Sequence, residues 1–178
     1  MSYGDTLTGL SEASEAAARA VWEAFEAGTI DRVGAIARLV SIAGMSNAQA
    51  IALADQGVAA TLTARFSEPV PVIGVPVPDD SGRLTMAAMT LLDEAGKGDT
   101  AARFARFGRC EPLDAAQRAW ADAIDASEYV SGWRRGLSSG ACELCRWLEK
   151  DGYVYPTSRK MHHHTGCRCE QIIVTERL

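Results

Sequence analysis

The residues of this chain best suited to chemistry are four cysteines and a histidine near its C-terminal end. Cys142 and Cys145 form a C-x-x-C pair, and His164 opens an H-x-x-C-x-C run that ends at Cys169. A C-x-x-C turn presents both sulfurs to one ion. Residues two apart on a strand face the same side, so both cysteines of the second run can point inward. The spacing therefore predicts a metal site with five candidate ligands: Cys142, Cys145, His164, Cys167 and Cys169.

Zinc suits this donor set, because it prefers soft sulfur and nitrogen ligands in a tetrahedral arrangement. Five candidates for four positions leave no open position, which favours a structural ion over a catalytic one. A module of about 40 residues buries too little surface to fold well alone, so the metal would stabilise it. His162 and His163 are expected to be solvated. Disulfides and unligated buried thiols remain the alternatives.

Composition bounds the class of protein. The chain has 178 residues, of which 47% are hydrophobic and 23% charged, as in one ordinary domain or a domain with a small satellite. We expect no signal peptide in Met1–Leu10, no apolar run long enough to span a membrane, and folding in a reducing compartment.

Charge divides the chain into two parts. Residues 1–132 carry 10 Lys and Arg against 18 Asp and Glu, whereas residues 133–178 carry 8 against 5. The acidic part is suited to contacts with other proteins, and the basic part to contact with DNA. The candidate DNA-facing residues are Arg134, Arg135, Arg146, Lys150, Arg159, Lys160 and Arg168.

Hydrophobic periodicity predicts a mainly α fold. We expect a first helix capped by Ser11 and a second that ends before Gly44. A third begins with the capping-box sequence at Ser46. Further helices are expected over residues 84–95, 100–107 and 112–135, and short strands over 153–155 and 171–175. The predicted fold is a helical body with an extended Pro-rich segment and a small C-terminal α+β zinc-type module.

These patterns predict four regions in the chain. They are an N-terminal helical region (1–68), a Pro-rich arm or linker (69–80), a helical region ending in a long helix (81–135) and a Cys/His module (136–178). Four prolines between Pro69 and Pro78 exclude a helix or a central strand there. The segment is either a stiff linker or an arm that lies along a partner. The arm hypothesis rests on its apolar residues, Val70, Val72, Ile73, Val75 and Val77.

The C-terminal motifs carry a family resemblance. The sequence around Cys142–Cys145, the aromatic Tyr153–Tyr155 segment and the run from His164 to Glu170 resemble the C-terminal module of MuF-like minor head proteins of tailed bacteriophages. The Ala-rich helical start is similar in style to head proteins of phages that infect actinobacteria. Thr165 stands where the family usually has proline, and the chain is short for the family.

The resemblance implies a non-enzymatic structural protein made in the host cytoplasm and carried inside the phage head. It would dock on the portal protein or the major capsid protein, in several copies within a symmetric assembly, and assist head assembly or DNA delivery. Contact with packaged DNA is expected, and contact with a membrane is not.

Two other functions remain alternatives. A zinc-stabilised nucleic-acid-binding protein would need a basic recognition helix, whereas residues 112–135 are acidic until their last turn. A His-metal nuclease would need a general-base histidine beside the ion. Only His162 and His163 qualify, and no paired carboxylates accompany them at a suitable spacing.

Overall fold

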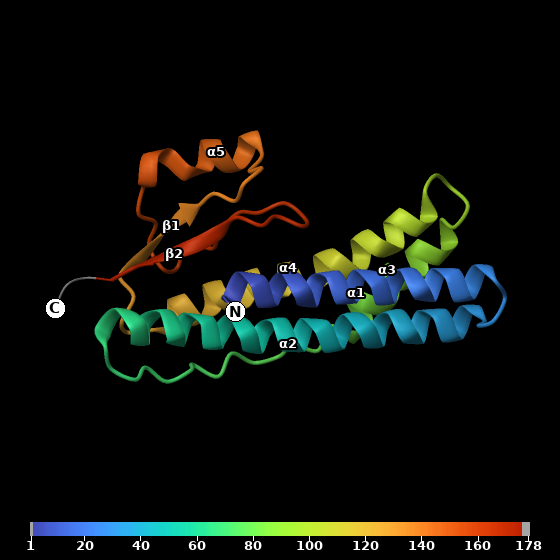
Figure 1. The fold of residues 1–178 in the computed structure, drawn as a ribbon, viewed down its shortest axis with the longest axis horizontal. Helices are drawn as coiled ribbons and strands as arrows, with labels where there is room; N and C mark the ends of the chain where they lie inside the picture. Colours follow the sequence, from blue (N-terminus) through green and yellow to red (C-terminus); the bar gives the residue numbers. More distant parts are fainter. Residues whose placement is uncertain (1, 176–178) are drawn as a thin grey trace. The chain divides into compact units, whose positions relative to one another are not determined.

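A computed structural model describes residues 2–175 and confirms a mainly α fold with a small α+β portion near the C-terminus (Figure 1). The elements in chain order are α1 (Tyr3–Glu26), α2 (Arg32–Phe66), α3 (Ser81–Asp93), α4 (Thr100–Ala126), β1 (Gly132–Gly136), α5 (Glu143–Glu149), the 3₁₀ turn η1 (Lys150–Gly152) and β2 (Glu170–Val174). The predicted C-terminal strand is confirmed, starting one residue earlier than expected.

The chain divides into two compact units. Unit 1 comprises the residues up to Ala50 together with Val77–Leu113, and unit 2 comprises Ile51–Pro76 together with the residues from Asp114 onward. The divisions fall inside α2 and α4, so each long helix contributes to both units. These units differ from the four regions expected from the sequence, because a contiguous stretch of sequence need not pack against itself.

Helix α1 begins earlier than its predicted cap. Ser2 is the N-cap: its hydroxyl accepts from the Asp5 amide (3.2 Å) and its own amide donates to the Asp5 carboxylate (3.0 Å). Ser11 instead lies inside the helix, fully buried, with its hydroxyl donating to the Thr8 carbonyl (2.9 Å). A serine hydroxyl can bond to either end of a local turn, so the residue type alone does not locate the cap.

The predicted break at Gly44–Ser46 is absent, and α2 runs through it as one helix. Ser46 does not cap a new helix. Its hydroxyl donates to the Ala43 carbonyl (3.1 Å) and accepts from the Ser14 hydroxyl (3.3 Å) in the interior of unit 1. One glycine costs a helix only about 1 kcal/mol, which packing on both sides can offset.

Helix α4 likewise continues through Gly108 and Pro112, where a break was predicted. Pro112 lies inside the helix and its side chain is fully buried. A Cβ on Gly108 would come within 2.4 Å of the Ser14 carbonyl oxygen of α1, so the close approach of these helices in unit 1 requires glycine. At the other end, the helix stops at Ala126 rather than Arg135, and residues 132–136 form strand β1.

Helix α2 unites the helix predicted to end before Gly44 with the helix predicted to begin at Ser46. Judged by length and composition only, it is long and apolar enough to cross a membrane. The sequence expectation rested on the absence of a long uninterrupted apolar run, whereas α2 meets the criterion as a whole helix in which polar residues interrupt the apolar ones. The core helix of a soluble protein meets the same criterion. Leu39 packs in the core of unit 1, and Val58 and Leu62 pack in the core of unit 2. The absence of membrane contact stays a prediction.

Apolar side chains from all its helices form the core of unit 1. The buried set is Ala18, Val21, Ala35, Leu39, Ala88, Leu92 and Phe104. Trp22 packs against Phe104 with 5.2 Å between ring centroids. Tight packing of small and large side chains accounts for the alanine-rich sequence of this unit.

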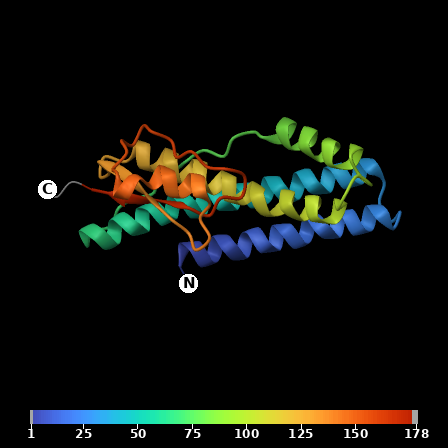
Figure 2. The same cartoon turned by 90° about the horizontal axis from the view of Figure 1, so that it is seen from above.

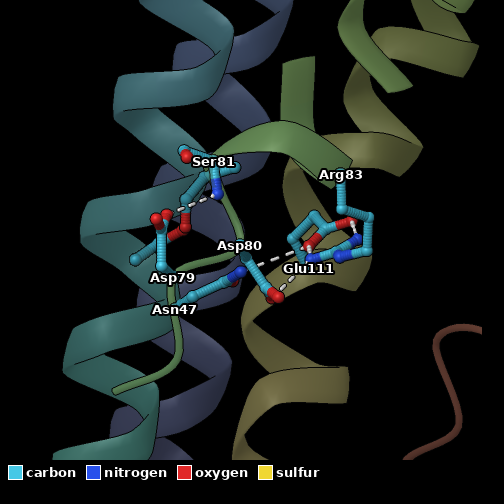
Figure 3. A network of polar contacts seen from close by, with 8 residues as sticks. Asn47, Asp79, Asp80, Ser81, Arg83 and Glu111 are labelled. Carbon is cyan, nitrogen blue, oxygen red and sulfur yellow. Dashed lines mark hydrogen bonds and ion pairs between the residues drawn. The ribbon is translucent and has the colours of Figure 1, made fainter. Parts of the chain in front are cut away.

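A polar network fastens α3 to its neighbours within unit 1 (Figure 3). Arg83 donates to both carboxylate oxygens of Glu111 on α4, at 2.9 and 2.7 Å, and to Asp80 at 2.9 Å. Asn47 of α2 donates to Glu111 at 3.2 Å. Hydrogen bonding to Glu111 raises the pKa of Arg83 above its ordinary value. The bidentate ion pair between Arg83 and Glu111 holds the start of α3 in place. At this position the side chain of the N-cap residue, Asp80, accepts no capping hydrogen bond from the backbone.

Unit 2 is organised around Trp133. Strands β1 and β2 pair antiparallel, with Trp133 opposite Ile173 and Arg135 opposite Gln171. The Trp133 indole is 1% exposed, stacks on Tyr155 (4.6 Å between centroids) and donates to the Arg159 carbonyl (2.8 Å). The strand predicted over residues 153–155 is reduced to one bridge between Trp133 and Tyr155.

The segment from Pro69 to Pro78 is extended and without helix or strand, as its prolines dictate (Figure 2). Its course from Val70 to Val75 is fixed within unit 2. The Asp55 carboxylate of α2 accepts from the amides of Ile73 (2.9 Å), Gly74 (2.8 Å) and Val75 (3.1 Å). Thr63 accepts from the Val70 amide (2.9 Å).

Because the segment is anchored to α2, the five residues predicted to form a partner arm differ in burial. Val70 and Val75 pack against the core of unit 2, whereas Val72, Ile73 and Val77 are exposed. The segment is therefore not a free arm with a continuous apolar face. Whether its three outward side chains contact a partner stays a prediction.

Candidate metal centre

The C-x-x-C pair lies at the start of the short helix α5. Cys142 is the N-cap residue, half-buried, and Cys145 lies in the first turn with 1% of its surface exposed. The remaining donors come from the turn that enters β2. The Cys167 amide donates to the His164 carbonyl (2.9 Å), and Cys167 and Cys169 are each buried. All of these residues belong to unit 2.

The structure brings all five predicted ligands together. One group of donor atoms within 4.8 Å of one another consists of Cys142, Cys145 and His164, and a second consists of Cys145, Cys167 and Cys169. The same five residues line a cavity of about 210 Å³. Cys145 is common to both groups and is therefore the central donor. The cluster can hold a metal ion.

The spacing of the sulfurs fits a tetrahedral ion. The Cys145 and Cys167 sulfurs are 3.6 Å apart. Two thiolates bound to zinc at 2.3 Å in tetrahedral geometry are about 3.8 Å apart. The distance is far longer than a disulfide bond, and all five cysteines, including Cys110 in unit 1, are free thiols. The disulfide alternative therefore does not describe this structure.

The four cluster thiols differ in acidity. Burial raises the pKa of Cys145 and of Cys167 above the ordinary thiol value. The nearby Cys145 amide lowers the pKa of Cys142. Burial opposes ionisation of Cys169 too, but hydrogen bonds from the backbone and side chain of Ser138 and from the neighbouring thiols together lower its pKa. Cys142 is thus easier to ionise than Cys145, and Cys169 is easier to ionise than Cys167. A bound cation would favour the thiolate form of all four cysteines.

Residues outside the predicted set support the cluster. Gln117 of α4 donates to the carbonyls of Cys167 (2.5 Å) and Cys169 (3.3 Å), which fixes the turn that carries both sulfurs. The Ser138 hydroxyl lies 3.7 Å from the Cys169 sulfur. The Arg135 guanidinium donates to the Cys145 sulfur at 3.6 Å. No motif pointed to Gln117, since its role depends on where α4 packs.

The three histidines lie in different environments. His162 and His164 are exposed, but His163 is only partly exposed and its Nδ1 lies 3.9 Å from the Asp114 carboxylate. Burial lowers the pKa of His163, although Asp114 acts in the opposite direction. The expectation of a solvated side chain is therefore confirmed for His162 and wrong for His163, which packs beside α4.

The seven candidate DNA-facing residues do not share one environment. Arg134, Arg146, Lys150, Arg159 and Arg168 are exposed, as is Lys160, whose ammonium pairs with Asp122 at 2.8 Å. Arg135 is only 4% exposed, so it cannot face DNA. The expectation placed Arg134 and Arg135 at the end of a helix. In β1 adjacent residues point to opposite faces, which turns one outward and the other inward.

Comparison of the chain with protein-family models, curated proteins and solved structures finds no match. The site and its chemistry therefore carry the functional argument.

Proposed function

We propose that this chain is a structural protein whose C-terminal module is held together by zinc, and that it serves as a minor head protein of a tailed phage. The observation that carries the structural part is the closed donor set. Five sulfur and nitrogen donors, from the start of α5 and from the turn that enters β2, surround one cavity. Four of them fill the coordination of zinc, which leaves no position for a substrate. Such an ion stabilises a fold and does not catalyse.

Zinc is the favoured ion because of the donors. Cys145, Cys167 and Cys169 supply three thiolates, and either Cys142 or His164 supplies the fourth ligand. Thiolate-rich tetrahedral sites select zinc over the hard cations calcium and magnesium, which take oxygen ligands. The immediate surroundings match a folding role, since Cys145, Cys167 and Cys169 form a small buried cluster with Ala141, against which Cys142 packs.

The phage part of the proposal rests on the resemblance of the C-x-x-C, aromatic and H-x-x-C-x-C segments to the MuF-like module. The surface of that module supports a docking role on the portal protein or inner capsid. Leu144 and Trp147, one helical turn apart on α5, are both exposed, and 69% of the Trp147 surface faces solvent. A tryptophan of this exposure is typical of a protein interface. The exposed Arg134, Arg146 and Arg168 support contact with packaged DNA.

The metal proposal is tested by elemental mass spectrometry of the purified chain. We expect about one zinc per chain. The double variant Cys142→Ser, Cys145→Ser should lose it, whereas Cys110→Ser, which alters a buried thiol of unit 1, should retain it. A chain without metal, or a double variant that binds as much zinc as the wild type, would contradict the proposal.

The head-protein proposal needs a separate experiment. We expect the chain to bind the portal protein of the same phage when the two are co-expressed, and to be detected by mass spectrometry in purified virions. Trp147→Ala should weaken portal binding while leaving the zinc content unchanged. Absence of the chain from virions would overturn the head assignment without affecting the metal site.

A further inference from the structure

We propose that Arg135 is a positioning residue of the metal centre, whose buried guanidinium balances the negative charge of the metal-bound thiolates. The inference rests on the proposed zinc site. It adds a residue that the cysteine and histidine spacing does not indicate.

The first observation is the burial of the charge. Arg135 is 4% exposed, and within residues 2–175 no carboxylate pairs with it. One of its terminal nitrogens donates to the His162 carbonyl, the other lies 3.6 Å from the Cys145 sulfur, and its Nε has no hydrogen-bond partner in the described part of the chain. A guanidinium remains protonated in proteins. A buried cation with no carboxylate beside it requires another source of negative charge.

The metal centre can provide that charge. A divalent ion with three thiolates and one imidazole carries one net negative charge, and with four thiolates it carries two. Cys145, the donor common to both groups of ligands, is the one that Arg135 contacts. A hydrogen bond to a metal-bound thiolate is charge-assisted and stronger than one to a neutral thiol.

The position of Arg135 is fixed by the backbone on which it sits. Strand β1 pairs it with Gln171 of β2, two residues after Cys169. Its neighbour Arg134 points outward from the same strand. The bond to the His162 carbonyl also ties down the segment that leads to His164. Arg135 thus contacts a ligand from one ligand-bearing segment and the backbone of the other.

The test compares Arg135→Met, Arg135→Lys and the control Arg134→Met, with zinc affinity measured by competition with a chelator. Loss of a residue around a metal site weakens binding by about 10- to 100-fold, and we expect this of Arg135→Met. Arg135→Lys keeps the charge and should recover most of the affinity. Arg134→Met removes an equal but exposed charge and should bind zinc as the wild type does.

Two further measurements distinguish the proposed charge-balancing role of Arg135 from a purely structural one. In the metal-free protein, Arg135→Met should destabilise the fold less than it does in the zinc-bound protein, because only the bond to the His162 carbonyl is lost there and the charge that Arg135 balances is absent. With Co²⁺ in place of zinc, Arg135→Met should shift the sulfur-to-cobalt charge-transfer band while the number of ligands stays the same.

Equal zinc affinity of Arg135→Met and the wild type would overturn the inference. So would equal destabilisation of the metal-free and metal-bound forms by Arg135→Met, or an affinity for Arg135→Lys as low as that for Arg135→Met. Failure of the wild type to bind zinc would instead overturn the proposed function on which the inference rests, so the two failures are distinguishable.

Discussion

Besides an apolar core of its own, unit 2 contains a buried cluster of a different kind from the core of unit 1. The cluster of unit 1 consists of aliphatic and aromatic side chains contributed by long helices. The cluster around α5 and the start of β2 consists of one alanine and three cysteines, with a fourth cysteine at its edge. The side chains of the first cluster bury their apolar surface against one another. The second cluster brings together thiols that can become charged thiolates.

The two clusters stabilise the fold in different ways. Burying apolar side chains is worth about 1.5–3 kcal/mol each and requires no partner beyond the chain. Cysteine thiols at the density found around Cys145 bury little surface, and as thiolates they would repel one another. A cation reverses that repulsion. The helical core should therefore be insensitive to metal, and the cysteine cluster should depend on it.

The largest effect is expected from Cys145→Ser, which removes the donor common to both ligand groups. Structural zinc binding contributes about 10–16 kcal/mol in small modules, so the segments around α5 and the start of β2 should unfold. Zinc content should fall to near zero, and hydrogen exchange should accelerate at the amides of α5. Cys110→Ser is the control, because it removes a buried thiol from unit 1. Retention of one zinc by Cys145→Ser would contradict the prediction.

The converse change is Phe104→Ala in the core of unit 1. Phe104 is fully buried, and truncating such a side chain costs about 3–5 kcal/mol. We expect a lower midpoint of urea unfolding with an unchanged zinc content in the folded protein. Val33→Ala, at an exposed position of α2, should change the free energy of unfolding by less than about 0.5 kcal/mol. Loss of zinc from folded Phe104→Ala would show that the two clusters are not independent.

A smaller effect is expected at the anchor of the Pro-rich segment. Asp55 accepts three backbone amides with two carboxylate oxygens. Asp55→Asn replaces one oxygen by a donor and removes the charge, at a cost of about 1–3 kcal/mol. Hydrogen exchange should accelerate at Ile73, Gly74 and Val75. Glu68→Gln, an exposed change near the same segment, should leave these rates alone, and unchanged rates in Asp55→Asn would refute the anchoring role.

The smallest effect on stability is expected from Trp147→Ala. The side chain is mostly exposed, so the free energy of unfolding should change by less than about 0.5 kcal/mol. Zinc content should stay the same, and only portal binding should weaken. Met86→Ala, an exposed apolar change in unit 1, is the matched control. A large loss of stability in Trp147→Ala would mean that the residue packs against the module and is no docking contact.

Local sequence determined the composition of the Cys/His cluster. C-x-x-C and H-x-x-C-x-C are short-range patterns, so a single turn brings each set of donors together, and all five predicted ligands do meet. The mainly α fold and the C-terminal strand were equally predictable, since hydrophobic periodicity and β-branched residues act over a few positions.

Tertiary structure decided what local preferences could not. Gly44, Ser46 and Pro112 favour a helix break by amounts that packing offsets, so the predicted helix pairs became the single helices α2 and α4. The segment after Ala126 became a strand because Gly132–Gly136 pairs with β2, and that pairing turned Arg135 inward. Asp55 and Gln117 acquired their roles only through the distant segments that fold onto them. Each of these outcomes depends on a contact between residues far apart in the chain, which spacing along the sequence does not encode.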